Sequence, residues 1–162
     1  MNALLDETRA PLADGKAALA FLLAGNARLT LRSLKTGTRF TYRVRAKEER
    51  APGAPAAEGG PFFVALLSGS DNEHDYQFLG TIFPKAGSTP VFAHGRKSRI
   101  GSDAPSARAF AWAATYLLRG VIPPDCEVWH EGRCGRCGRA LTDPESIASG
   151  IGPVCGGHKE AA

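Results

Sequence analysis

Hydrophobic and polar residues alternate with a period of two along residues 27–47, on both sides of a Lys-Thr-Gly turn. This pattern is typical of two half-buried antiparallel strands joined as a hairpin. The residues expected to face the core are Leu29, Leu31, Phe40, Tyr42 and Val44. Those expected to face outward are Arg28, Thr30, Arg32, Arg39, Thr41, Arg43, Arg45 and Lys47. The hairpin is therefore expected to have one apolar side and one cationic side.

Four further segments have the apolar character of strands. Residues 62–67 (FFVALL) are wholly apolar, as in a central strand, and residues 76–83 (YQFLGTIF) can pair with them across a polar loop. Residues 90–94 give a weaker strand signal, and residues 126–130 (CEVWH) alternate again. Together with the hairpin, these segments predict a mostly antiparallel sheet.

One longer helix is expected over residues 102–120, SDAPSARAFAWAATYLLRG. Asp103 or Ser102 can cap its start, Pro105 suits its first turn, and Gly120 can end it. An apolar stripe along one side of this helix consists of Phe110, Ala114, Leu117 and Leu118. The stripe predicts that the helix packs across the sheet.

Charge is unevenly distributed along the 162 residues, whose formal net charge is +4. Residues 1–120 hold 16 Lys and Arg against 10 Asp and Glu, a net charge of +6, whereas residues 121–162 hold 4 against 6, a net charge of −2. Seven cations and no acid lie between residues 28 and 47. The most apolar run, residues 17–25, is too short to cross a membrane and follows acidic residues. A cytoplasmic protein without a membrane span is therefore expected.

Three of the four cysteines follow one another in the order Cys134-x2-Cys137-x17-Cys155. Glycines flank the first pair, which suits a tight turn in which two thiolates bind one ion. Three thiolates and one histidine complete a tetrahedral Zn²⁺ site without an open position, so one zinc ion with a structural role is expected. Cys126 lies in an alternating segment and is expected to be a buried thiol.

Two histidines can supply the fourth zinc ligand. His158 follows the last cysteine with the usual two-residue spacing, although the two intervening glycines disfavour a helix there. His130 lies four positions before the first cysteine, and spacing alone leaves both histidines open. Between the two halves of the site, residues 143–149 (DPESIAS) are expected to form a short helix that ends at Gly150.

These elements predict an α+β fold, with a mostly antiparallel sheet of about five strands, one packed helix and a small C-terminal zinc module. The expected divisions are an N-terminal tail at residues 1–17, a sheet domain at residues 18–122 and the zinc module at residues 123–162. Within the sheet domain, residues 49–61 are rich in Pro, Ala and Gly, so they are expected to form a flexible loop.

The stretch HEGRCGRCGRALTDPESIASGIGPVC, residues 130–155, resembles the signature of a domain family of unknown function found in small bacterial and phage or prophage proteins. The shared positions are a His-x-Gly-x-Cys-x2-Cys-Gly-Arg run, then Leu-Thr, Pro and Ser, and finally Gly-Ile-Gly-Pro with the last cysteine. Upstream segments resemble the companion region of such proteins, so the similarity covers about residues 20–155. Because the histidine of the signature precedes its first cysteine, the resemblance implies His130 as the fourth ligand. It also implies a mobile-element origin.

The cationic side of the hairpin is the best candidate for a working surface, because like charges on paired strands repel each other unless a polyanion neutralises them. We expect contacts to a phosphate backbone, with duplex preferred over single strand because the hairpin aromatics have the inward phase. The residues expected to bind nucleic acid or an acidic partner are Arg28, Arg32, Arg39, Arg43, Arg45, Lys47, Arg96, Lys97 and Arg99. The sequence thus predicts a non-enzymatic, zinc-containing nucleic-acid-binding protein.

Two other interpretations stay open. The chain can be a protein-binding module, for example a phage-type inhibitor or modulator that meets an acidic host protein with its cationic side. That side can also be a solvated sheet face that only keeps the protein soluble. The acidic stretch at residues 68–76 has turn chemistry and is expected to be a polar loop, not a catalytic metal site. No nucleophile elbow, P-loop or Rossmann glycine pattern is present, so no enzyme is expected.

Overall fold

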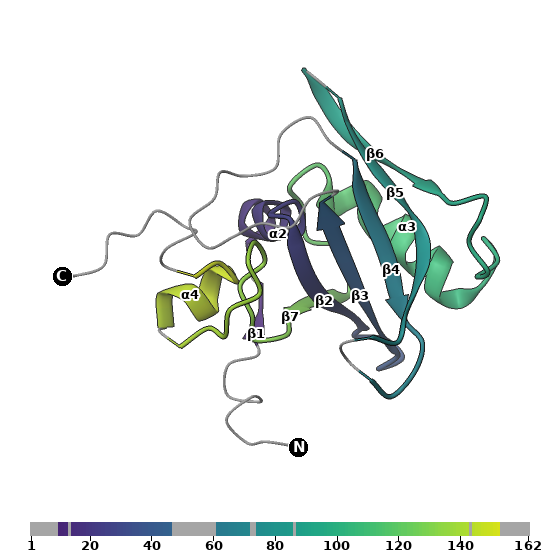
Figure 1. Cartoon of the computed structure of the whole chain (residues 1–162). Helices are drawn as coiled ribbons and strands as arrows, with labels where there is room; N and C mark the ends of the chain where they lie inside the picture. The colour runs from purple at the N-terminus through teal and green to yellow at the C-terminus, as the bar shows by residue number, and fades with distance from the viewer. Residues whose placement is uncertain are drawn as a thin grey trace.

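The computed structural model describes residues 10–12, 14–46, 61–71, 74–85, 87–142 and 144–152. Within these residues, one antiparallel sheet holds seven strands in the order β1-β7-β2-β3-β4-β5-β6 (Figure 1). The strands are β1 (Ala10–Pro11), β2 (Asn26–Ser33), β3 (Arg39–Ala46), β4 (Phe62–Leu67), β5 (Tyr76–Lys85), β6 (Ser88–His94) and β7 (Cys126–His130). The helices are α2 (Gly15–Leu22), α3 (Pro105–Leu117) and α4 (Pro144–Ser149).

The predicted fold class, α+β with about five strands and one packed helix, is wrong. Seven strands and three short helices make the described part of the chain mostly β. One missed element, β1, has only two residues, which is too few to give an alternating pattern. The other, α2, forms from the apolar run at residues 17–25, because the Asp14 carboxylate accepts a hydrogen bond from the Ala17 N–H at 3.3 Å and caps a helix there.

β7 belongs to the sheet and not to the C-terminal module. It lies between β1 and β2 and pairs with both. The observed module therefore begins after residue 130, whereas a boundary at residue 123 was expected. The expected tail at residues 1–17 likewise includes β1 and the start of α2. Residues 49–60 of the expected flexible loop lie outside the described residues.

The hairpin prediction is confirmed, since β2 and β3 pair antiparallel along their length. Its inward residues are buried, apart from Phe40, which is partly buried. The buried Tyr42 hydroxyl donates to the Ser106 carbonyl of α3 at 2.7 Å, and the Tyr42 ring centroid lies 4.9 Å from that of Phe110. α3 lies behind the central strands in Figure 1, and α2 also packs into this core. The outward arginines of the hairpin lie on the opposite face of the sheet.

The main helix starts later than predicted. Pro105 is in its first turn as expected, but the N-cap residue is Ala104 and no side chain caps the helix, so the expected cap at Ser102 or Asp103 is wrong. The predicted apolar stripe is buried. Gly120 has a φ of +75°, and its N–H donates to the Leu117 carbonyl at 2.9 Å, as expected for the end of a helix. No helix in the described part of the chain combines the length and apolar character that a membrane span requires.

Candidate metal centre and basic sheet face

Cys134 and Cys137 lie in one tight turn of the chain. The Cys134 N–H donates to the Arg139 carbonyl at 2.7 Å, and the Gly138 N–H donates to the Cys134 carbonyl at 2.9 Å. Gly138 has a φ of +81°, a left-handed conformation that glycine adopts without strain. The Arg136 N–H points at the Cys134 sulfur, with an N–S distance of 3.4 Å, and the Cys137 side chain also hydrogen-bonds to Cys134. The turn therefore brings the two thiols together.

The surroundings of Cys134 favour a thiolate. Burial by itself raises the pKa of this thiol. The backbone N–H groups of Gly152, Cys137 and Arg136, together with the Cys137 side chain, outweigh burial and hold the pKa below its ordinary value. A thiolate is the form of cysteine that binds a metal ion, so the turn has the donor chemistry that zinc requires.

The other expected cysteine ligand, Cys155, and the histidine His158 lie outside the described residues. Among the residues that the structure describes, no three His, Cys, Asp or Glu side chains form a group that could hold a metal ion. The chain nevertheless returns to the cysteine turn just before Cys155. The Gly150 carbonyl accepts a hydrogen bond of 2.8 Å from that turn, and a Cβ built on Gly152 would lie 3.8 Å from the Cys134 sulfur. Residues 150–152 therefore lie against the cysteine turn.

His130 is fully buried at the end of β7, and hydrogen bonds occupy both of its ring nitrogens. The Gly132 N–H donates to Nδ1 at 3.0 Å, so Nδ1 is an acceptor. Nε2 therefore carries the proton and donates to the Ile147 carbonyl at 2.5 Å. Burial lowers the pKa of the imidazole, and the Ile147 carbonyl and Glu131 offset this only in part, which keeps the ring neutral. In this arrangement His130 joins β7 to α4, and no ring lone pair remains for a metal ion.

The C-terminal module packs on the ring of Phe21 in α2. That ring lies 6.1 Å from the His130 ring, measured between centroids. A Cβ built on Gly135 would lie 2.5 Å from the Phe21 ring, and one built on Gly150 would lie 2.6 Å from it. Side chains at these two positions would collide with Phe21. The two glycines therefore allow the module to approach the sheet closely.

The outward arginines of β2 and β3 share one face of the sheet, as predicted. Arg28 lies opposite Arg43, and Arg32 lies opposite Arg39. β7 also brings an acid to this face, because an Arg32 guanidinium nitrogen (Nη1) lies 3.0 Å from a Glu127 carboxylate oxygen. The sequence spacing did not reveal this pair, since Glu127 is distant along the chain. We call the outward residues of β2, β3, β4 and β5 the open face.

The second group of cations, within residues 96–99, follows β6 and is exposed. The Ser98 hydroxyl donates to the Phe78 carbonyl at 2.8 Å, which joins this loop to β5. β4 and β5 therefore lie between the loop and the hairpin arginines. The fold brings the two basic groups to opposite sides of these strands and not into direct contact. Lys47 lies outside the described residues.

The aromatic residues between the two groups of cations were not predicted from the sequence. The side chains of Phe63, Phe78 and Phe83 are 39%, 38% and 47% exposed. The Arg43 guanidinium lies over the Tyr76 ring, 4.5 Å from its centroid. The wholly apolar FFVALL segment predicted a strand buried on both sides, which concealed its outward residues. Only the observed order of the strands shows that these rings adjoin the arginines.

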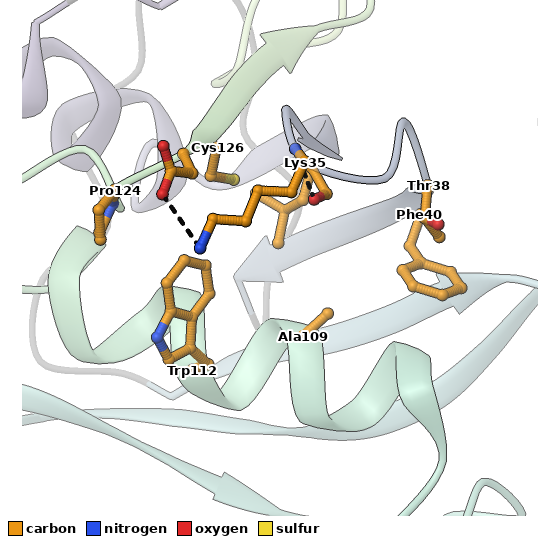
Figure 2. A pocket seen from close by; sticks show the side chains of 10 residues that line it. Lys35, Thr38, Phe40, Ala109, Trp112, Pro124 and Cys126 are labelled. Atoms are coloured by element: carbon orange, nitrogen blue, oxygen red, sulfur yellow. Dashed lines mark hydrogen bonds and ion pairs between the residues drawn. The ribbon is translucent and has the colours of Figure 1, made fainter.

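A separate pocket of about 290 Å³ opens on the helix side of the sheet (Figure 2). Its lining consists of Leu31, Ser33, Lys35, Thr38, Phe40, Ala109, Trp112, Pro124, Asp125 and Cys126. The Lys35 ammonium lies 3.5 Å from the Asp125 carboxylate, and the Lys35 side chain extends toward Trp112. Cys126, expected to be buried, is partly buried here, and its burial raises the pKa of the thiol. The pocket is thus mostly apolar and holds a protonated thiol.

The fold and the cysteine turn define a class of protein, a mostly β protein whose sheet carries a small C-terminal module rich in cysteine and glycine. Residues 129–158 match the model of a family described as "Family of unknown function (DUF6011)". This match includes the two candidate zinc ligands His130 and His158 and all three clustered cysteines. It agrees with the resemblance to an uncharacterised family. No curated protein and no solved structure matches the chain.

Proposed function

We propose that the protein binds nucleic acid through the open face and that one structural zinc ion holds the C-terminal module together. The observation that carries the proposal is the pairing of Arg28 with Arg43 across β2 and β3, with Arg45 close by on the same face. A surface on which several cations gather attracts the phosphate backbone of a nucleic acid. We also propose that the protein is cytoplasmic and that it has the phage-type origin that the sequence resemblance implies.

The zinc ligands that we propose are Cys134, Cys137, Cys155 and His158. The hydrogen bonds of His130 favour His158 as the fourth ligand, because the buried ring of His130 would have to give up both partners to bind a metal ion. Zinc with four protein ligands supplies folding energy and no reactive position. The residues of the module therefore hold structure and carry out no reaction.

The test is the salt dependence of binding to a fluorescent DNA, measured as duplex and as single strand. If about five phosphates are neutralised, the log-log slope of the duplex binding constant against salt should be roughly −4 to −5. Replacing Arg43 and Arg45 by Gln should weaken binding and reduce that slope by about two. The matched control replaces Arg108 and Arg119 by Gln. Both are exposed at or beside α3 on the other side of the sheet, so this variant should bind as wild type does.

The protein-binding alternative has its own supporting observation. Arginine and exposed aromatic residues together, as on the open face, are also enriched in protein interfaces. An acidic protein partner would then bind where we place nucleic acid. If purified protein binds neither duplex nor single strand at low salt, or if the Arg43 and Arg45 double variant binds as tightly as wild type, the nucleic-acid proposal is wrong.

A further inference from the structure

Arginines and aromatic rings form continuous rows across the open face. One row runs from Arg28 to Arg43, then Ala65 and Phe78, through the register of four neighbouring strands. Arg45 and Phe63 are paired in the same way in the adjacent row. Neighbouring strands are about 4.8 Å apart, so each ring lies only one or two strand spacings from an arginine. Cations and rings are therefore within reach of one bound molecule.

The rings in these rows are left partly uncovered. Phe63 and Phe78 each keep more than a third of their surface exposed, although their sequence neighbours Phe62, Val64 and Leu79 pack into the core. Phe63 pairs with Thr81 and Phe78 pairs with Ala65, so the two rings lie in neighbouring rows of the open face. Apolar side chains that are exposed together on one face mark a binding surface. The Arg43 guanidinium over Tyr76 adds a flat cationic plane beside them.

The aromatic rows also have cations on both sides. The hairpin arginines lie on the β3 side, and the basic loop of residues 96–99 lies on the β5 side. The Phe78 ring lies against Gly95, the residue directly before this loop, because a Cβ built on Gly95 would lie 2.3 Å from its Cε2 atom. A polyanion with flat, apolar bases along its length fits such a surface better than a uniformly charged rod.

We infer that the open face binds single-stranded nucleic acid, with bases stacked on Phe63 and Phe78 and with the backbone held by the flanking cations. This inference rests on the proposed function and refines it. In a duplex, each base is already stacked on its neighbours and only base edges are accessible in the grooves. The rings of β4 and β5 would then gain nothing from binding. In a single strand, every base has an accessible π face, so the rings contribute directly.

The test compares a labelled single strand of about 12 nucleotides with the same strand in a duplex, by fluorescence anisotropy at one salt concentration. The single strand should bind at least about tenfold more tightly. Phe63→Leu and Phe78→Leu should each weaken single-strand binding by about five- to a hundredfold and leave duplex binding unchanged. The matched control is Trp112→Leu, since Trp112 is a similarly exposed aromatic residue on α3, across the sheet from the open face.

Two measurements keep the result decisive. Thermal unfolding shows whether each leucine variant is folded, and ultraviolet cross-linking of the wild-type protein to the single strand maps the contact without any mutation. Cross-links should fall on β4 and β5. Duplex binding as tight as single-strand binding, unchanged affinity in both phenylalanine variants, or cross-links on α3 would overturn the inference while the proposed function stands. Absence of binding to both forms would overturn the two together.

Discussion

The sheet and the C-terminal module obtain their stability in different ways. The sheet and helices α2 and α3 share one large core of buried aliphatic and aromatic side chains, including Tyr42 and Phe110. In the described part of the module, the separate buried cluster consists of Cys134 and Leu141, with three more residues partly buried against it. A segment with so little apolar burial does not fold by itself. One chain therefore combines a fold held by hydrophobic burial with a module that needs another source of stability.

The module has two such sources, the proposed zinc ion and its contact with the sheet. The backbone of the module packs closely on the Phe21 ring at Gly135 and Gly150, and the His130 ring joins β7 to α4 through hydrogen bonds. Phe21 in α2 and His130 in β7 belong to the sheet and its core, so their positions should not depend on the metal. Removing the metal and removing the junction should therefore have different consequences, which separates the two contributions.

The largest expected effect is that of zinc removal. Protein purified without chelator should contain one zinc ion per chain, and a strong chelator should unfold residues 131–160 while the sheet stays folded. Structural zinc contributes roughly 10–16 kcal/mol of apparent binding free energy in small zinc domains, far more than the small apolar cluster of the module can replace. Two-dimensional NMR should show module amides collapsing to random-coil shifts while those of β2 to β5 remain.

The matched control is a Cys126→Ser variant, because Cys126 lies in β7 beside the pocket and outside the proposed site. It should keep its zinc, whereas Cys137→Ser should lose it. If the module stays folded after chelation, or if the protein contains no stoichiometric zinc, the module does not depend on a metal ion for its stability and the contrast with the sheet is wrong.

Much of the sheet was predictable because its signal is local. Alternation placed Leu29 and Val44 inward correctly, and the turn between them limited their pairing to one hairpin. Strand order was not predictable, because it depends on contacts between segments far apart in sequence. β7 inserts beside β2 and brings Glu127 against Arg32, and nothing near either residue in the sequence indicates this.

The candidate site was predictable only in part for the same reason. The spacing of Cys134 and Cys137 predicts their shared turn, since both lie within four residues. Residue spacing does not indicate hydrogen bonds. The hydrogen bonds of His130 with Gly132 and Ile147 could be seen only in the structure, where α4 packs beside β7. The aromatic residues of the open face were hidden because an apolar run carries no sign of which residues face outward.

An intermediate effect separates the two histidines. His130→Ala should lower the free energy of unfolding by about 2–4 kcal/mol, because it removes a fully buried ring and leaves the Gly132 N–H and the Ile147 carbonyl without their partner. It should nevertheless retain zinc in metal analysis after purification. His158→Ala should lose zinc affinity and leave the sheet unchanged. Loss of zinc in the His130 variant alone, with full retention in the His158 variant, would reverse this assignment.

The smallest expected effect lies inside the sheet core. Burial, and secondarily the nearby Cys126, raises the pKa of Tyr42, so its hydroxyl is a neutral donor at any ordinary pH. Its partner, the Ser106 carbonyl, lies in the first turn of α3 and also accepts the regular helix hydrogen bond. Tyr42→Phe therefore removes one hydrogen bond without leaving that carbonyl empty, and it keeps the ring that packs on Phe110.

The expected cost of Tyr42→Phe is about 1 kcal/mol in the free energy of unfolding, measured by urea denaturation of the zinc-loaded protein. Zinc affinity should not change, because the hydroxyl lies between the central strands and α3, away from the cysteine turn. Phe110→Leu, which alters the same core without removing a hydrogen bond, serves as the comparison variant. If Tyr42→Phe weakened zinc binding measurably, the core of the sheet and the metal module would be coupled, and the separation of their sources of stability would not hold.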